Sequence, residues 1–283
     1  MNKDYKENVK IKNLNKFKSF KDLDLHNTLD NDNRTDFHLA CLNDKVSVEL
    51  VKYMLKNKCD ANLIDKHGKT VFHYAAGNNN ISTEVLKLFI KEAHSNPNTK
   101  DKEGNNVFHL LCKNEAVIAT DALEYLLENK IAINELNNLE SPLHLLCKRY
   151  YESKENAFRM INCLLKNKAD PNLSDMEGIT PFHLICSSNH NLSFEILSLL
   201  IEFNAEINKA DKKGNFPLHF LSDNEAITPK IVQLFDHTSI EKKNMSYKTP
   251  LHSVFFFFIF FFFFIFFLNF FFKFFNVLNL ILI

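Results

Sequence analysis

The sequence predicts an all-α fold in which helix–turn–helix units stack into a solenoid. Three observations lead to this prediction. A short motif that ends in histidine recurs seven times at nearly constant spacing. Each copy begins an apolar stretch, and a second apolar run with helical periodicity follows in each of the first six units. A loop then leads to the next copy, with a glycine at the same place in four of the loops. A fixed period in this range is typical of repeats that bury a core only by stacking on their neighbours.

The recurring motif is clearest at Thr180–Cys186, which reads T-P-F-H-L-I-C. The histidines of successive copies are 35, 36, 35, 39, 36 and 33 residues apart. The copies are Thr35–His38, Thr70–His73, Asn106–His109, Ser141–His144, Thr180–His183, Phe216–His219 and Thr249–His252. Thr or Ser can accept a bond from an unpaired N–H of the first turn, and Pro at the next position already has a helical φ. A first helix therefore begins at each copy.

The second apolar run of each unit has spacings of one, three and four, as expected for the buried stripe of an amphipathic helix. The runs are Leu50, Val51, Met54 and Leu55; Val85, Leu86, Phe89 and Ile90; Leu123, Leu126 and Leu127; Ile161, Leu164 and Leu165; Ile196, Leu197, Leu200 and Ile201; and Ile231, Val232, Leu234 and Phe235. Each unit is thus predicted to be a helical hairpin followed by a loop.

With these features the chain resembles the ankyrin-repeat family over about Leu25–His252. The resemblance rests on the T-P-L-H-type tetrapeptide, the Leu-Leu pair of the second helix and the ending K-N-K-A-D-P-N-L-S-D-M-E-G-I-T at Lys166–Thr180, which recurs in modified form at Lys56–Thr70. It implies that each motif histidine is a neutral group that bonds locally and to the neighbouring turn. The structural motif positions are Thr35, His38, Thr70, His73, His109, Ser141, His144, Thr180, His183, His219, Thr249 and His252.

Three segments are expected. Residues 1–33 form an N-terminal cap or degenerate leading repeat, 34–248 an array of about six repeats, and 249–283 a truncated seventh repeat that runs into a Phe-rich tail. Alignment of Asp30 and Asn33 with Asp65 and Gly68 favours a leading repeat, since end repeats must present a polar outer face. A disordered basic tail is the alternative, and the N-terminal end has no secretory apolar region.

The cysteines are predicted to be reduced and buried. Cys41, Cys112, Cys147 and Cys186 each lie three residues after a motif histidine and thus share one position of the first helix. Stacked helices are about 8–10 Å apart, whereas a disulfide requires Cα atoms within about 7 Å. The residues therefore act as small apolar fillers, which favours a reducing, intracellular location with the repeats in the cytoplasm.

No catalytic, cofactor or metal site is expected. The chain lacks a G-x-S-x-G, a phosphate-binding glycine loop and an H-E-x-x-H motif. The His-x-x-Cys pairs, such as His38 with Cys41, occur once per unit and do not assemble a tetrahedral ligand set. Four of the five glycines, Gly68, Gly104, Gly178 and Gly214, occupy one loop position at which a positive φ is expected.

The resemblance implies a concave face, lined by long loops and first helices, that binds a protein partner. The candidate contacts at the loop tips are Lys66, His67, Lys102, Glu103, Met176, Glu177, Lys212 and Lys213. The longest spacing, 39, places a few extra residues within 148–156, where they are expected to lengthen the tip of the helical hairpin. Tyr150 and Tyr151 in this segment are further candidates, with packing against the hairpin edge as the alternative. Lys+Arg and Asp+Glu both number 34, so the charge balance does not indicate nucleic acid. For each tip side chain a solubilising role is the alternative.

The C-terminal tail has a composition unlike the rest of the chain. Val254–Leu268 contains fifteen consecutive apolar residues, and only three Asn and one Lys interrupt the run to Ile283. Over its full length to Ile283 the tail exceeds the ~20 apolar residues that span a bilayer, so hydrophobicity alone predicts a membrane anchor. The tail, however, interrupts the seventh repeat directly after its motif and consists almost entirely of residues whose codons A and T alone can form, and such aromatic tracts aggregate in water. These features favour a translated A/T-rich non-coding stretch, with a membrane anchor and a buried soluble element as the alternatives. The expected function is a non-catalytic protein-binding scaffold; a membrane-tethered adaptor or a fragment of a larger protein are the other hypotheses.

Overall fold

The computed structural model describes residues 29–42, 46–79, 81–114, 120–150, 154–187, 192–222, 227–235, 240–250 and 252. The helices named in this part of the chain are α2 (Asp36–Leu42), α3 (Val48–Lys56), α4 (Val71–Ala76), α5 (Thr83–Lys91), α6 (Val107–Lys113), α7 (Thr120–Glu128), α8 (Pro142–Arg149), α9 (Lys154–Lys166), α10 (Pro181–Cys186), α11 (Phe194–Glu202), α12 (Pro217–Leu221) and α13 (Pro229–Val232). Among these residues there is no strand, only an isolated bridge between Ile64 and Thr70. The chain divides into two compact units, 1–176 and 177–283.

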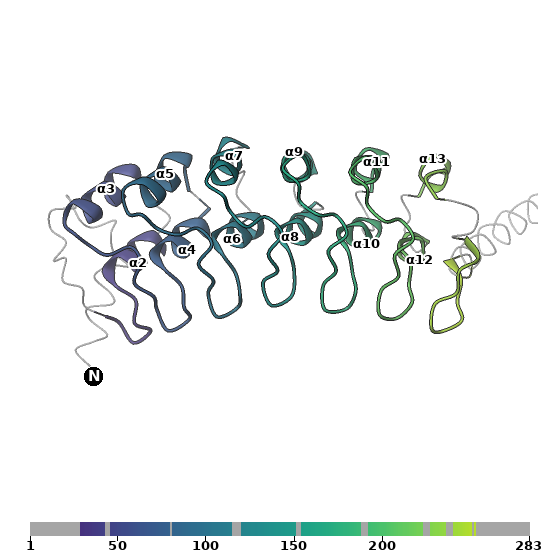
Figure 1. Cartoon of the computed structure of the whole chain (residues 1–283), viewed down its shortest axis with the longest axis horizontal. Helices are drawn as coiled ribbons and strands as arrows, with labels where there is room; N and C mark the ends of the chain where they lie inside the picture. The colour runs from purple at the N-terminus through teal and green to yellow at the C-terminus, as the bar shows by residue number, and fades with distance from the viewer. Residues whose placement is uncertain are drawn as a thin grey trace, which may run out of the picture. The chain divides into compact units, whose positions relative to one another are not determined.

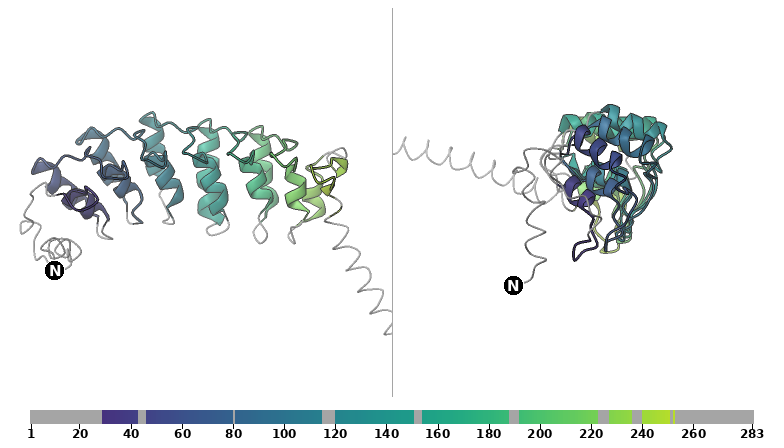
Figure 2. Two further views of the ribbon diagram at one scale, coloured as in Figure 1. Left: turned by 90° about the horizontal axis from the view of Figure 1, so that it is seen from below. Right: turned by 90° about the vertical axis from the view of Figure 1, so that its left-hand side faces the viewer.

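The first unit consists of two rows of helices and a row of hairpin loops (Figure 1). The first helices α2, α4, α6 and α8 pack successively against one another, and the second helices α3, α5, α7 and α9 do the same. Figure 2 shows these helices side by side when the unit is viewed from below. Helices therefore contact their neighbours in the same row, and α4 contacts α5 and α8 contacts α9 within a unit, as in a stacked repeat array.

The second unit repeats this arrangement with fewer helices. First helix α10 packs on α12, second helix α11 packs on α13, and α10 contacts α11. Phe182 of α10 and Phe235, just after α13, have ring centroids 6.1 Å apart. The all-helical repeat fold predicted from the sequence is confirmed.

The first helices begin where the motif predicts. The Ser141 and Thr180 side chains accept bonds from the backbone N–H groups of His144 and His183, and a proline follows each cap. The second helices have caps that the sequence analysis did not identify. These caps are Ser47, Ser82, Ser193 and Thr228, and each accepts a bond from the N–H three residues later. Both helices of a unit are thus started by a local side chain.

The core lies between the two rows of helices. In the first unit the Phe72 and Phe89 rings stack at 4.9 Å, and Phe37 stacks on the other side of Phe89 at 5.9 Å. Cys41, Cys112, Cys147 and Cys186 are free thiols with no exposed surface, which confirms the prediction made for them. Burial raises the pKa of each of these thiols, so they remain neutral fillers.

Two expectations about the second helices need correction. Helix α13 has only four residues, and Val232 is 37% exposed because a single turn buries only Ile231. The insertion 148–156 was expected to lengthen the tip of a helical hairpin. Instead α8 extends to Arg149 and α9 has thirteen residues, so much of the added length is helical. The stack continues, since α8 still packs on α6 and α9 on α7.

Some predictions fall on residues outside the described part of the chain. These are residues 1–28 of the predicted N-terminal cap or leading repeat, the side chain of Tyr151, and the membrane segment considered for Val254–Ile283. Within the described ranges, no helix has the length and apolarity needed to cross a membrane.

Candidate interaction surface

Each motif histidine links the start of its own helix to the following loop. The Nδ1 atom of His183 accepts a bond from the Thr180 N–H at 3.2 Å and lies 2.8 Å from Thr180 Oγ1. Because Nδ1 is an acceptor, the proton of the neutral ring is on Nε2, which faces the Asn215 carbonyl at 3.3 Å. The imidazole thus connects a helix to the hairpin that follows in the second unit.

The same geometry recurs in the first unit. His73 Nε2 lies 3.0 Å from the Thr99 carbonyl and 3.2 Å from the Asn105 carbonyl, and His109 Nε2 lies 3.0 Å from the Glu135 carbonyl. Burial lowers the pKa of His38 and His73, and lowers the pKa of His109 to about 4. These rings are therefore neutral at physiological pH, and backbone groups contact both nitrogens.

The loops between units are tight hairpins organised by the side chain of an Asp or Asn. In the hairpin Asp101–Asn105, Asp101 Oδ1 accepts from the Glu103 and Asn105 N–H groups at 2.9 and 2.8 Å. Gly104 has φ +79°, and a Cβ there would lie 2.9 Å from the Asn138 backbone nitrogen. Glycine therefore allows both the turn and the close approach of the next hairpin.

The same hairpin frame occurs at both ends of the described array without glycine. Asp30 Oδ1 accepts from the Asp32 and Arg34 N–H groups, each at 2.8 Å, and Asn33 takes the positive φ, at 58°. This agrees with the alignment of Asp30 and Asn33 with Asp65 and Gly68. In the second unit, Asn244 is the bonding side chain and Tyr247 has φ 58°. Both hairpins resemble those of the complete repeats.

Single backbone hydrogen bonds join several pairs of neighbouring hairpins at their tips. In the first unit, the N–H groups of Lys66, Lys102 and Asn138 donate to Asp32, His67 and Glu103 at 2.8, 2.9 and 3.1 Å. In the second unit, Lys212 donates to Glu177 at 2.9 Å and Met245 donates to Lys213 at 3.0 Å. The tip backbones are therefore fixed by these bonds.

The predicted contact residues at the tips have exposed side chains. In the first unit they are Lys66, His67, Lys102, Glu103 and Met176, and in the second unit Glu177, Lys212 and Lys213. The backbone bonds between tips use the main chain of these residues, except Met176, and leave their side chains exposed. Figure 1 shows the hairpins on one side of each unit, below the first helices. In each unit the structure brings these side chains into one row.

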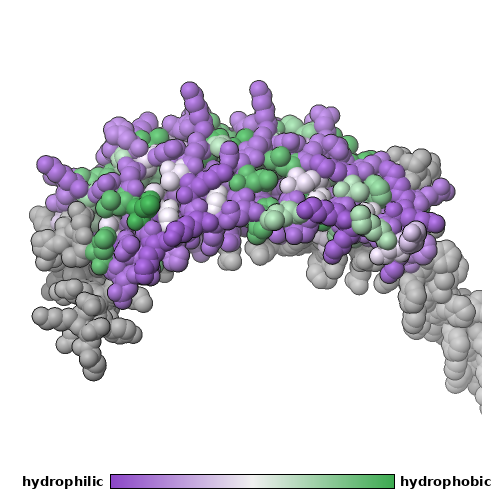
Figure 3. All heavy atoms as spheres, turned by 60° about the horizontal axis from the view of Figure 1, so that its bottom comes forward, coloured by the Kyte–Doolittle hydropathy of each residue, from purple (hydrophilic) through white to green (hydrophobic). Residues whose placement is uncertain are grey.

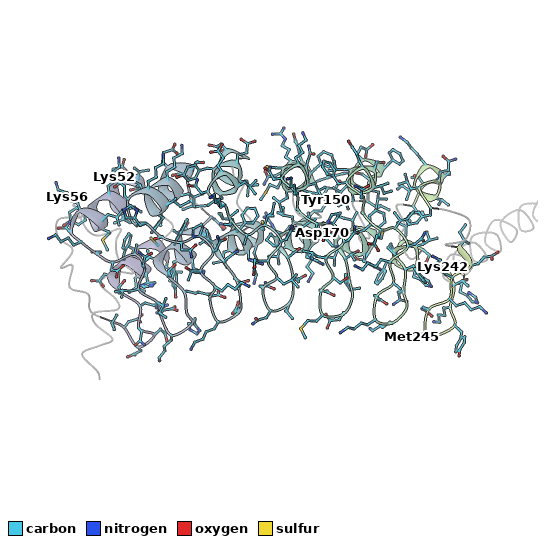
Figure 4. The ribbon with its side chains drawn as sticks, viewed as in Figure 1. Lys52, Lys56, Tyr150, Asp170, Lys242 and Met245 are labelled. Carbon is cyan, nitrogen blue, oxygen red and sulfur yellow. The ribbon has the colours of Figure 1, made fainter. Side chains whose placement is uncertain are left out.

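The structure corrects the prediction that Tyr150 is a contact residue. It was a candidate contact residue, but only 1% of its surface is exposed, and it is among the largest fully buried side chains. The reason is that α8 continues to Arg149, so Tyr150 is its C-cap residue and lies within the helical layers (Figure 4). The alternative interpretation, packing against the hairpin, is the one that agrees with this burial.

Several exposed apolar residues near the tips were not among the predicted contacts. Leu139 follows Asn138 in the hairpin Asn137–Glu140 and is 53% exposed. Met245 and Tyr247, at the last hairpin of the second unit, are 73% and 80% exposed. Alignment of these loops with Lys102–Gly104 would have identified them. Figure 3 shows small hydrophobic patches separated by mainly hydrophilic side chains.

Comparison with known proteins identifies the family. The model of ankyrin repeats (3 copies) matches residues 7–94 and 150–246, more than half of the chain. The chain belongs to the ankyrin-repeat family. Ankyrin repeats are generally protein–protein interaction modules and are typically not catalytic. A comparison with curated proteins gives no significant match.

Solved ankyrin-repeat structures share the fold. The ankyrin repeat domain of human ASB11 is 18% identical, with a TM-score of 0.61 over 78% of this chain and 91% of that domain. The ankyrin repeat domain of Bcl-3, described as a unique member of the IkappaB protein family, is 19% identical, with a TM-score of 0.55 over 74% of this chain and 84% of that chain. At such low identity the similarity concerns the fold alone.

Proposed function

We propose that this ankyrin-repeat chain is a non-catalytic scaffold that binds a protein partner through its hairpin tips and first-helix face. The observation that carries the proposal is the ladder of backbone bonds between tips, which holds rows of exposed, chemically varied side chains in fixed positions. A surface that is already ordered loses little conformational entropy when a partner binds. The motif histidines and cysteines of the same units have structural roles and are not part of this proposed binding surface.

The test compares two surfaces of the first unit by proximity labelling with the full chain. One variant, Lys66→Ala with Lys102→Ala, removes two exposed tip lysines. Its matched control, Lys52→Ala with Lys56→Ala, removes two exposed lysines of α3, on the side away from the hairpins (Figure 4). Partners labelled by the unmodified chain should bind the tip variant about tenfold more weakly, roughly 1.4 kcal/mol. Equal effects of the two variants would contradict binding at the tips.

A second proposal follows from the sequence of the tail. Residues 254–283, in which only three Asn and one Lys interrupt the apolar residues, are long enough to span a bilayer and would tether the repeats at a membrane surface. The full chain should then remain in the membrane pellet after alkaline extraction, whereas Phe261→Asp with Ile265→Asp should release it. A fully soluble unmodified chain would rule out the tether. Sequencing the transcript across the codons for His252–Ile283 tests whether the tail is translated.

A further inference from the structure

At three positions in the first unit, the residue five places after a motif histidine caps the C-terminal end of the preceding first helix. The Asn78 side-chain amide donates to the Cys41 carbonyl at 3.0 Å, and the Asn114 amide donates to the Ala76 and Asn78 carbonyls at 3.2 and 2.8 Å. Carbonyls at this end of a helix have no partner within the helix, so the amide satisfies them. Asparagine performs this task without introducing a charge.

In the next unit Arg149 occupies this position, five residues after His144. Its Nη1 donates to the Cys112 carbonyl at 3.0 Å, so it caps α6 as the asparagines cap their helices. Arg149 is only 8% exposed, and its Nε is buried without a hydrogen-bond partner. No carboxylate of the described residues is within ion-pair distance of this guanidinium. A buried cation without a counter-ion is unfavourable, and capping alone does not require it.

Arg149 lines a pocket of about 450 Å³ on the hairpin side of the first unit. The other lining residues come from two hairpins and two first helices: Glu103, Asn105, Lys113, Asn137, Asn138, Leu139, Glu140, Leu145 and Lys148. The second of these hairpins closes with the Asn137–Glu140 bond and is one residue shorter than Asp101–Asn105. The pocket thus opens beside the tip residues that carry the proposed function.

The charges in this pocket leave a cationic excess. Lys148 Nζ pairs with Glu140 Oε1 at 2.5 Å, and Glu103 Oε2 accepts a bond from the Asn105 amide at 3.1 Å. Glu140 thus has a cationic partner in Lys148, although its buried Oε1 makes no hydrogen bond, and Glu103 is bonded to a neutral amide. Arg149 and Lys113 have no anionic partner among the described residues, so the five charged side chains that line the pocket sum to one positive charge. The apolar surfaces of Leu139 and Leu145 complete the lining. An anionic group flanked by aliphatic atoms would complement this arrangement.

We infer that this pocket receives a glutamate or aspartate side chain from an acidic segment of the protein partner, with Arg149 as its counter-ion. The inference rests on the proposed scaffold function and specifies the chemistry of the partner. A carboxylate matches the single excess charge, and its hydrocarbon stem matches the exposed Leu139. The position of the pocket beside the tips favours a segment of a docked protein over a free small anion.

The test uses the full chain and fluorescein-labelled hexaglutamate, with hexaglutamine as the neutral control, in fluorescence anisotropy at low and high salt. Arg149→Asn introduces the residue of the two preceding units, Asn78 and Asn114, and should keep the cap of α6. It should weaken hexaglutamate binding at least tenfold. The matched control Arg159→Gln removes one exposed arginine of the neighbouring helix α9 and should change binding less than twofold. Raising the salt concentration should weaken the unmodified complex.

Two further measurements separate the alternatives. Lys113→Gln, at an exposed position, should weaken binding about threefold without affecting the fold, so it replaces Arg149→Asn if that variant melts at a lower temperature. Equal binding of hexaglutamine, or unchanged binding by Arg149→Asn, overturns the inference. Glutarate or inorganic phosphate that binds as tightly as the peptide overturns it in favour of a small-anion site. A partner that still depends on Lys66 and Lys102 would leave the scaffold function standing in each case.

Discussion

Two copies of the motif in the second unit have the same local geometry and different surroundings. Thr180 Oγ1 lies 2.8 Å from His183 Nδ1, and Thr249 Oγ1 lies 2.7 Å from His252 Nδ1. His183 is fully buried and faces the Asn215 carbonyl, whereas His252 is exposed and lacks such a carbonyl partner among the described residues. The tetrapeptide therefore determines the helix start. The element packed against it determines how much the histidine stabilises the fold.

The largest expected difference between the two copies concerns the imidazole itself. His183→Ala leaves a cavity and an unpaired carbonyl, so it should lower the free energy of unfolding by about 3 kcal/mol. His252→Ala removes an exposed ring and should cost less than about 0.5 kcal/mol. Urea denaturation followed by circular dichroism measures both. Equal losses for the two variants would show that burial is not the deciding factor.

A buried motif histidine should also make stability depend on pH. His109 has its pKa lowered to about 4 by burial, against about 6.5 in the unfolded chain. The folded state therefore binds fewer protons, so its stability is complete above pH 6.5 and falls as the pH decreases towards 4. The loss at His109 should reach about 2–3 kcal/mol. His109→Gln should be less stable at pH 7 and should show a smaller loss between pH 6.5 and 4.5 in urea titrations.

A smaller effect is expected for the capping hydroxyl. Thr180→Ala removes the acceptor of the His183 N–H and one contact of the imidazole, which should cost about 1 kcal/mol. Thr249→Ala should cost about half as much, because His252 is exposed and depends less on its position. Thermal unfolding of the two variants tests this order. A larger loss at Thr249 would contradict the explanation based on burial.

The same contrast explains which features were predictable from the sequence. The start of each first helix depends on neighbouring residues, so Ser141 and Thr180 could be identified as caps before the structure was known. The glycine hairpins were equally local, as the positive φ of Gly68, Gly104, Gly178 and Gly214 confirms. The burial of Tyr150 was not local, because it depends on how far α8 continues after the motif.

The candidate site likewise has a part that the sequence predicts and a part that it does not. The exposed tips could be located by aligning the loops, and the structure places those side chains in rows. The pocket at Arg149 could not be predicted, because its walls come from Glu103, Leu139 and Lys148, which lie in separate parts of the sequence. The one available signal was that Arg149 occupies the position of Asn78 and Asn114. That signal has meaning only once the asparagines are seen to cap helices.

The sequence by itself determined the repeat, its helix starts and its turns, because these depend on bonds between residues a few positions apart. Tertiary structure decided which histidine is buried, which tyrosine is hidden and where a charge lacks a counter-ion. The physical reason is that burial and charge compensation depend on side chains about 35 residues away in sequence, brought together only when the units stack. Arg149 beside the hairpins is the clearest case.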